Sequence, residues 1–411
     1  MSFSQALSGL NAQASKLGTI GNNIANSQTV GFKGSNVQFS DVFAGSKVGL
    51  GTRVSSVLQN FNEGNVESTN RNLDLAIAGD GFFRFQDPSG EVVYSRNGQL
   101  TMTAQGDLVN AQGAQIMGYG LNAAGQVQVG GQPVPLSVAT EELGASATTD
   151  VATTLNLDAR KVIGGERSTV ESSNGEEIEY HYSNNFTVFD SLGNPRNITV
   201  YYEKVDSNQW TAKMTLDGRA LMDAGEAEEF LLEFNENGQL IEPAGGVLAN
   251  VTFDKDEFLA GEPNDLIFDL NLAGTTQFGN TSTVSSLNQN GYTSGTLVGI
   301  TINDDGTIMR NYSNEQSRPA GQVALVSFRN PEGLTPSGDN VWSASAASGQ
   351  ELIGAPGTGL LGSVVSGAIE TSNVDMAREL VDMIVAQRAY QANSQTIKTQ
   401  DELLQTAINL R

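Results

Sequence analysis

The sequence predicts mainly β domains, barrel-like or sandwich-like, on a terminal α-helical coiled coil. Three observations predict this: a narrow apolar stripe along each end of the chain, short alternating runs between the ends, and 46 glycines in 411 residues. Glycine and small polar residues concentrate in turns, so this composition is typical of turn-dense β structure. Because both ends belong to one helical layer, the predicted domains are discontinuous and nested.

The first 24 residues predict a helix. Their apolar residues recur in alternating steps of four and three, the spacing of a coiled-coil seam. The predicted seam, which we expect to pack in an assembly, contains Phe3, Leu7, Leu10, Leu17 and Ile24. The asparagines that follow predict the end of the helix near residue 26.

The last 40 residues predict a longer helix with the same spacing, and neither Gly nor Pro interrupts them. Ser372 or Asn373 is the expected N-cap, and Asp375 in the first turn favours the helix dipole. The seam positions expected to pack are Leu380, Met383, Tyr390, Ile397, Leu404 and Ile408. A helix with such a stripe needs a partner, first the other end of the chain and then the ends of neighbouring copies.

Between the helices, short alternating runs bounded by turn residues predict strands. The predicted strands include residues 81–85, 92–94, 185–190, 198–203, 209–216, 228–234, 299–302, 307–310 and 320–328. The expected domains are a helical layer (1–26 plus 372–411), an irregular connector (27–70 plus 349–371), an inner β domain (71–145 plus 291–348) and an outer acidic β domain (146–290).

The chain is strongly acidic, with a formal net charge of −24. Residues 146–290 alone hold 24 Asp and Glu against 8 Lys and Arg, a net charge of −16. Such a charge gives no general attraction to nucleic acid or anionic lipid. No run approaches 18 apolar residues, so no membrane insertion is expected, and the N-terminus lacks the features of a cleaved signal. The chain has no cysteine, which excludes disulfides and a thiol nucleophile.

No catalytic residue, metal site or cofactor is predicted, and we expect no enzyme. His181 is the only histidine and is flanked by tyrosines that indicate a strand. Residues 357–362 match G-x-G-x-x-G but lack the strand before and the helix after that a dinucleotide fold requires, so a turn is expected. Residues 303–306 (NDDG) lack the full spacing of a calcium loop and predict a hairpin turn.

Four strings together resemble the axial proteins of the bacterial flagellum, the rod and hook subunits. The N-terminal one contains Asn22, Asn23, Ile24, Ala25 and Asn26, followed by Gly31, Phe32 and Lys33. The second covers residues 72–83 and the third 94–109. The fourth covers 372–393, with the run AQRAYQAN. The length, residues 41–51 and the C-terminal ending are most similar to the hook members of this family.

This resemblance implies a self-assembling helical homopolymer, a flexible curved tube that acts as a universal joint and transmits torque from rod to filament. It implies an extracellular location in the hook and export through the flagellar type III apparatus without a cleaved signal peptide. The implied partners are other copies of the chain, the hook cap, the distal rod subunit, the hook–filament junction protein and the export apparatus.

Two alternatives remain open at this point. The first is a distal rod or other axial flagellar subunit with a large insert. The second is a secreted β protein that binds or degrades carbohydrate, which would need an aromatic platform and convergent carboxylates. The two tryptophans, Trp210 and Trp342, are far apart in sequence and disfavour it.

Overall fold

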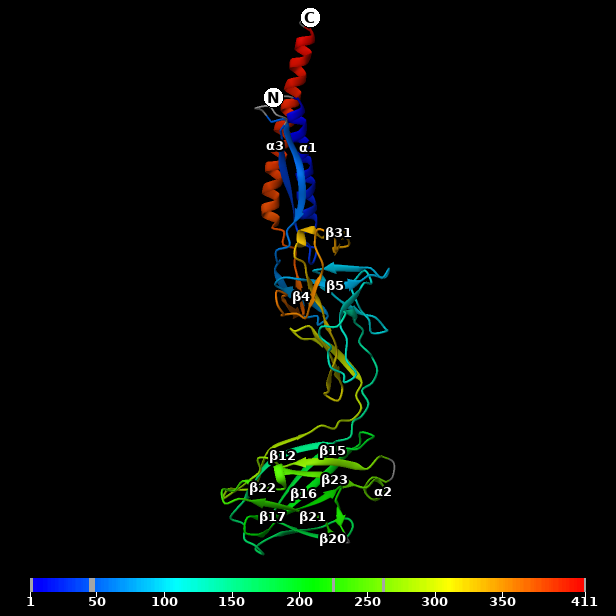
Figure 1. Ribbon diagram of the computed structural model, residues 1–411, viewed down its shortest axis with the longest axis vertical. Helices are drawn as coiled ribbons and strands as arrows, with labels where there is room; N and C mark the ends of the chain where they lie inside the picture. The colour runs from blue at the N-terminus through cyan, green and yellow to red at the C-terminus, as the bar shows by residue number, and fades with distance from the viewer. Residues whose placement is uncertain (1–2, 44–48, 224–225, 261–262, 410–411) are drawn as a thin grey trace. The chain divides into compact units, whose positions relative to one another are not determined.

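The computed structural model describes residues 3–43, 49–223, 226–260 and 263–409. It divides into two compact units, and each is described by itself. Unit 1 comprises residues 1–140, 298–311 and 317–411, and unit 2 comprises 141–297 and 312–316. The mainly β fold with a helix at each end is confirmed (Figure 1). The predicted boundaries of the four nested domains stay predictions.

Unit 1 contains both long helices, α1 (Phe3–Ala25) and α3 (Met376–Asn409), which pack against each other. The N-cap of α3 is Asp375, whose Oδ1 accepts hydrogen bonds from the backbone N–H of Ala377 at 2.9 Å and of Arg378 at 3.2 Å. The prediction that Ser372 or Asn373 caps this helix is therefore wrong. The physical reason is that the Asn373 side chain bonds to the backbone of another segment of unit 1.

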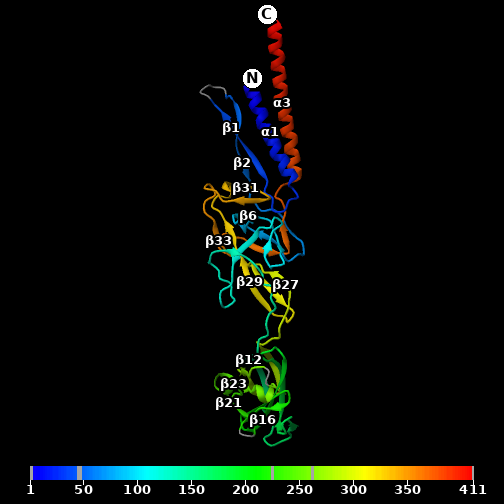
Figure 2. The same ribbon diagram turned by 90° about the vertical axis from the view of Figure 1, so that its right-hand side faces the viewer.

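A β-hairpin packs along α1 (Figure 2). Its strands are β1 (Ser35–Val42) and β2 (Gly51–Gln59), which pair antiparallel over their whole lengths. The prediction that residues 27–70 are irregular is wrong for this stretch. A register shift between Gln38 and Phe39 interrupts the period-two alternation of the first strand, so the sequence pattern does not read as a strand.

The rest of unit 1 is a β body with short strands. They are β3 (Val66–Ser68), β4 (Asp74–Ala78), β5 (Phe82–Gln86), β6 (Val92–Ser95), β7 (Gly98–Gln99), β8 (Thr101–Met102), β9 (Leu108–Val109), β10 (Gln115–Tyr119), β11 (Val134–Pro135), β27 (Leu297–Ile302), β28 (Thr307–Tyr312), β29 (Ser317–Val323), β30 (Leu325–Ser327), β31 (Thr335–Gly338), β32 (Val341–Ser343), β33 (Leu352–Gly354), β34 (Ser363–Ser366) and β35 (Ala368–Glu370), with a 3₁₀ turn at Pro331–Gly333.

The side chains of β5 alternate between two apolar clusters of this β body. Phe83 and Phe85 enter the main core, whereas Phe82 enters an aromatic cluster with Phe328 and Trp342. Successive side chains of a strand point to opposite faces, so one strand supports both clusters.

Unit 2 is built mainly from two large sheets around its main core, and it also contains two two-stranded sheets. One sheet has the order β23-β24-β12-β25 with β26 beside β12, and the other has the order β15-β16-β17-β21-β22 with β18 beside β17. The elements are β12 (Asp150–Asp158), β13 (Ser168–Glu171), β14 (Glu177–Tyr180), β15 (Tyr182–Phe189), β16 (Pro195–Asp206), β17 (Gln209–Leu216), β18 (Arg219–Ala220), β19 (Met222–Asp223), β20 (Glu226–Ala227), β21 (Glu229–Phe234), β22 (Leu240–Glu242), a 3₁₀ turn (Ala244–Gly246), β23 (Val247–Phe253), α2 (Lys255–Phe258), β24 (Leu266–Asn271), β25 (Thr276–Phe278) and β26 (Thr283–Gln289).

The predicted strands of the acidic segment are confirmed by β15, β16, β17 and β21. Strand β16 shows why: Ile198, Val200 and Tyr202 alternate with more exposed neighbours and are fully buried. They meet Trp210 from β17 and Phe253 from β23 in the same core. A sandwich of two sheets therefore closes unit 2 on its own apolar residues.

Candidate functional site

The predicted seam of the two helices is only partly covered in the single chain. Five seam residues are exposed, by 42% (Leu7) to 72% (Ile408) of their surface: Phe3, Leu7, Leu380, Leu404 and Ile408. The others are partly buried: Leu10, Leu17, Ile24, Met383, Tyr390 and Ile397. The helices thus leave a row of apolar side chains without full cover.

The buried apolar residues of the two helices are other, mostly small ones. The fully buried apolar positions are Ala6, Ala12 and Ile20 in α1 and Ala386 in α3. At Gly9 the helices approach so closely that a Cβ atom would lie 2.9 Å from the side-chain nitrogen of Asn393. The four-three spacing did not include these positions; Ala and Gly carry little hydrophobic signal, and Ile20 lies outside the predicted stripe.

Asn23 joins three elements at the base of the helical layer. Its side-chain amide donates to the carbonyl of Ser35 at 2.9 Å and to Oε1 of Glu379 in α3 at 3.1 Å. Its Oδ1 accepts from the backbone N–H of Ser35 at 2.9 Å. The side chain is 2% exposed, so this signature residue fixes the end of α1 against β1 and α3.

The neighbouring signature residues end α1. The side-chain amide of Asn26 donates to the backbone carbonyl and to Oδ1 of Asn22, at 3.0 and 3.1 Å. The carbonyl of Ile24 accepts from the Ser27 hydroxyl at 2.9 Å, while Ala25 is exposed. These bonds satisfy polar groups at the last turn of the helix.

A buried ionic cluster lies beneath the helices, and we call Lys33, Arg96 and Glu370 the ionic node. Glu370, at the end of β35, is fully buried. Its Oε1 accepts from Nζ of Lys33 at 2.6 Å and from the backbone N–H of Gly64 at 2.8 Å, and its Oε2 accepts from Nε of Arg96 at 2.7 Å. The node ties the segment after α1, the β body and the segment before α3 together.

The two cations of the node are also satisfied by backbone carbonyls. Lys33 donates to the carbonyl of Asn62 at 2.6 Å, and Arg96 donates to the carbonyls of Gly79 and Gly81 at 2.9 and 2.6 Å. Buried charges are tolerated when they are paired and hydrogen-bonded, and each charge of this cluster has an ionic partner and at least one further hydrogen bond to the backbone.

Charge and burial shift the pKa values of Glu370 and Lys33 in opposite directions. Burial alone would raise the pKa of Glu370, but hydrogen bonding and charge from Arg96, with the charge of Lys33, outweigh it and hold the pKa below its usual value. Burial lowers the pKa of Lys33, and the carboxylate of Glu370 opposes that shift. The carboxylate is thus the charge on which both cations depend.

Two further signature residues hold the backbone at the node. Gly31 has φ +70°, and a Cβ there would lie 2.7 Å from the backbone nitrogen of Asn97. Its N–H donates to the carbonyl of Glu370 at 2.7 Å, and the carbonyl of Phe32 accepts from the backbone N–H of Asn373 at 3.4 Å. Only glycine combines this conformation with so close an approach.

The features considered for catalysis have structural roles. His181 lies at the edge of the unit 2 core, with its ring 5.9 Å from that of Trp210, and its Nδ1 accepts from the N–H of Lys204 at 3.1 Å. Residues 357–362 form a turn that leads into β34, and residues 303–306 form the turn between β27 and β28, as predicted. Within the described ranges, no three His, Asp or Glu side chains gather as a metal site. In the same ranges, no helix is long and apolar enough to cross a membrane.

Four family models match successive segments of the chain. Residues 4–33 match "Flagella basal body rod protein", 76–144 match "Flagellar hook protein FlgE/F/G D1 domain", 156–292 match "Flagellar basal body protein FlaE D2 domain", and 365–410 match "Flagellar basal body rod FlgEFG protein C-terminal". The nested fold, the paired terminal helices and these segments place the chain in the class of flagellar rod and hook proteins.

Relatives of full length narrow this class. The chain is 43% identical over 412 residues to flagellar hook protein FlgE of Salmonella typhimurium, with 100% of both chains covered. It is 43% identical over 415 residues to that of Escherichia coli and 31% over 455 residues to that of Borreliella burgdorferi, covering 100% and 99% of those proteins. The crystal structure of Helicobacter pylori hook protein FlgE2 has a similar fold, with a TM-score of 0.54 and 13% identity over 74% of this chain and 100% of that one. The chain belongs to the flagellar hook protein family and is a structural subunit of the bacterial hook.

Proposed function

We propose that the chain polymerises through its terminal helices into the flexible curved tube of the hook, which acts as a universal joint between rod and filament. The observation that carries this proposal is the exposed apolar seam of α1 and α3, represented by Leu7, Leu380 and Leu404. Apolar rows of this kind lose contact with water when neighbouring helices cover them, which favours association.

The ionic node has a separate task in this proposal. A tube that transmits torque needs a stiff connection between the helices that assemble and the β body that they carry. Glu370 supplies it by binding Lys33 and Arg96 from two other segments. Unit 2 contains the acidic segment 146–290, and a charged surface holds water, which suits contacts that exchange as the tube bends.

The partners belong to the same proposal. Copies of the chain form the tube, the distal rod subunit and the hook–filament junction protein meet its two ends, and the hook cap covers the growing end. The chain reaches this site through the flagellar type III apparatus without a cleaved signal peptide. We infer that its role is structural rather than enzymatic.

Electron microscopy of basal bodies from a deletion strain tests the proposed function. We expect a complete rod with no hook, and we expect the full-length chain supplied in trans to restore hooks and swimming. A strain that stops at an incomplete rod would instead support the distal rod alternative. A strain with normal hooks would refute the proposal.

A further inference from the structure

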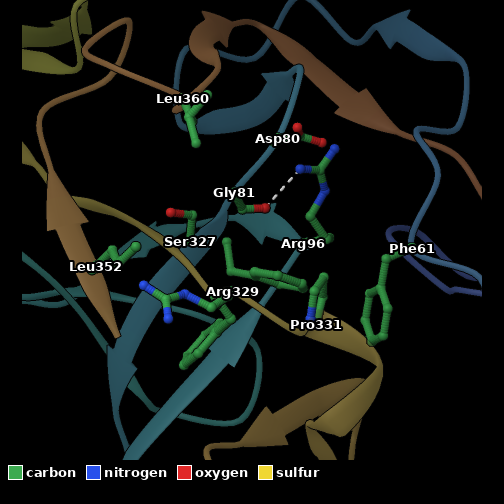
Figure 3. Close-up of a pocket in the computed structure, with 11 residues that line it drawn as sticks. Phe61, Asp80, Gly81, Arg96, Ser327, Arg329, Pro331, Leu352 and Leu360 are labelled. Carbon is green, nitrogen blue, oxygen red and sulfur yellow. Dashed lines mark hydrogen bonds between the residues drawn. The ribbon is translucent and has the colours of Figure 1, made fainter. Parts of the chain in front are cut away.

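A cavity of about 440 Å³ opens on the β body of unit 1 (Figure 3). Its wall is mostly aromatic and aliphatic, with Phe61, Phe82, Phe328, Leu352 and Leu360. Leu352 and Leu360 are 54% and 84% exposed, so large apolar side chains form an open rim.

The polar groups of the cavity are distributed unevenly. Arg96 belongs to the node, and Asp80 lies beside it, whereas Arg329 lies at a different part of the wall near Leu352 (Figure 3). Arg329 is exposed, and among the described residues its guanidinium has no hydrogen-bond or ion-pair partner. An occupant of matching chemistry therefore carries an apolar, preferably aromatic, group with a carboxylate beside it.

The same chain presents such a group elsewhere. Phe39, Asp41 and Phe43 stand at alternate positions of β1 and its end, and all three are exposed, Phe43 by 63%. Alternate residues of a strand share a face, so an aromatic, a carboxylate and a second aromatic project together. No hydrogen bond or ion pair of the Asp41 carboxylate occurs within the described part of the chain.

The hairpin cannot fill the cavity of its own subunit. Its base is fixed to the β body, because Nε1 of Trp342 donates to Oε1 of Gln59 at 2.6 Å. Val42 pairs with Gly51 at the far end of the hairpin, eight residues from Gln59, which is roughly 26 Å at the rise of a strand. Phe43 is thus far from Phe61 in the same copy, and the occupant has to come from another copy.

We propose that, in the hook, Phe43 of one subunit inserts into this cavity of a neighbouring subunit and that Asp41 forms an ion pair with Arg329 there. This inference rests on the proposed polymer. The contact is heterologous, because one patch of each subunit meets a different patch of the next, and such contacts generate helical polymers. This insertion adds a specific contact between subunits to the apolar packing of the helices.

Cysteine cross-linking tests the insertion, since the parent chain has no cysteine. Phe43→Cys and Leu352→Cys are combined in one chain, hooks are isolated, and a mild oxidant is added. We expect a ladder of multimers on a non-reducing gel. Each single variant should give at most dimers. The matched pair Phe43→Cys with Val298→Cys, which uses another exposed apolar residue of unit 1, should give no ladder.

A charge exchange tests the ion pair without altering the aromatic group. Asp41→Arg and Arg329→Asp should each lower the number of hooks per cell several-fold, and the double exchange should restore it. The double neutral variant, Asp41→Asn with Arg329→Gln, should not. Both residues are exposed and unpaired in the described chain, so none of these changes removes a contact that the folded subunit needs.

Two results would overturn the insertion. One is intact hooks in which the Phe43 and Leu352 cysteines give no ladder or no more than the Val298 pair gives. The other is a double charge exchange that gives no more hooks per cell than the single variants give. If Phe43→Cys itself blocks assembly, Asp41→Cys with Arg329→Cys and a short bis-maleimide replaces the first pair, with the same criteria. Absence of hooks from the parent chain would refute the polymer itself, which separates the two failures.

Discussion

Unit 2 buries its large apolar side chains, whereas the terminal helices leave several of theirs exposed. In unit 2 the large side chains, such as Trp210, Phe253 and Phe268, are at most 1% exposed between two sheets. In the helices, large side chains such as Leu380 and Leu404 are 47% and 57% exposed. Unit 2 therefore completes its core within one chain, whereas the helices retain apolar surface that other copies can cover.

This difference separates folding from assembly. Damage to unit 2 should change the stability of that unit and leave the polymer contacts of the helices in place. Damage to the exposed seam should do the reverse. The two tryptophans allow the two events to be followed, because Trp210 lies in unit 2 and Trp342 in unit 1. In a Trp342→Phe background the fluorescence of Trp210 follows the unfolding of unit 2. In a Trp210→Phe background the fluorescence of Trp342 follows the unfolding of unit 1.

The largest expected effect is on assembly. Removing residues 402–411 should abolish hooks, because this change deletes the exposed seam residues Leu404 and Ile408. The urea unfolding of unit 2, read from Trp210 fluorescence, should be unchanged. Hooks of normal length in the truncated strain would show that the end of α3 is not needed for polymer formation.

The second effect concerns the core of unit 2. Phe253→Ala removes a fully buried ring that stacks on Phe268, and such truncations cost about 3–5 kcal/mol of unfolding free energy. Urea unfolding followed by Trp210 measures the loss. The unfolding of unit 1, followed by Trp342, should not shift. An equal shift in both reporters would contradict the independence of the two units.

The third effect concerns the ionic node. Glu370→Gln leaves Lys33 and Arg96 buried without their counter-charge, and loss of one partner from a buried ion pair costs about 3 kcal/mol or more. Urea unfolding of unit 1, read from the fluorescence of Trp342, should show this loss of unfolding free energy. The control Glu91→Gln changes an exposed glutamate of the same unit, and a similar loss there would assign the effect to net charge rather than to the node.

The fourth effect is the pH dependence of the node. The pKa of Glu370 is lowered in the folded chain, so its stabilisation is fully present above its usual value of 4.5 and is lost as the pH falls below that value toward the folded pKa. The stability of unit 1 in the parent chain should therefore fall more steeply in this acid range than that of the Glu370→Gln variant. Parallel curves for the two chains would contradict the assignment.

The smallest effect on stability should come from the seam. Leu404→Ser replaces an exposed residue, and such changes usually alter the unfolding free energy by no more than about 0.5 kcal/mol. The number and length of hooks should fall nonetheless, as counted by electron microscopy. Thr406→Ser, a change at an exposed polar position of the same helix, is the matched control and should leave hooks unchanged.

Local sequence patterns were sufficient to predict most of the helices and strands. The four-three spacing predicted both helices, and alternation predicted β17 with its observed bounds and the central half of β16. The first strand of the hairpin was missed because a bulge after Gln38 breaks the alternation. The N-cap was misassigned because Ser, Asn and Asp all suit that position, and only the engagement of Asn373 elsewhere leaves Asp375 to cap α3.

The sequence by itself determined the fold class, the helical ends and the acidic segment, because these follow from periodicity and composition along the chain. The signature strings marked Asn23, Gly31 and Lys33 without giving their roles. Only the tertiary structure decided that Lys33 and Arg96 share the carboxylate of Glu370, from segments 274 to 337 residues away along the chain. The physical reason is that an ion pair depends on distance and burial in space, and no local pattern encodes which distant charges the fold brings together.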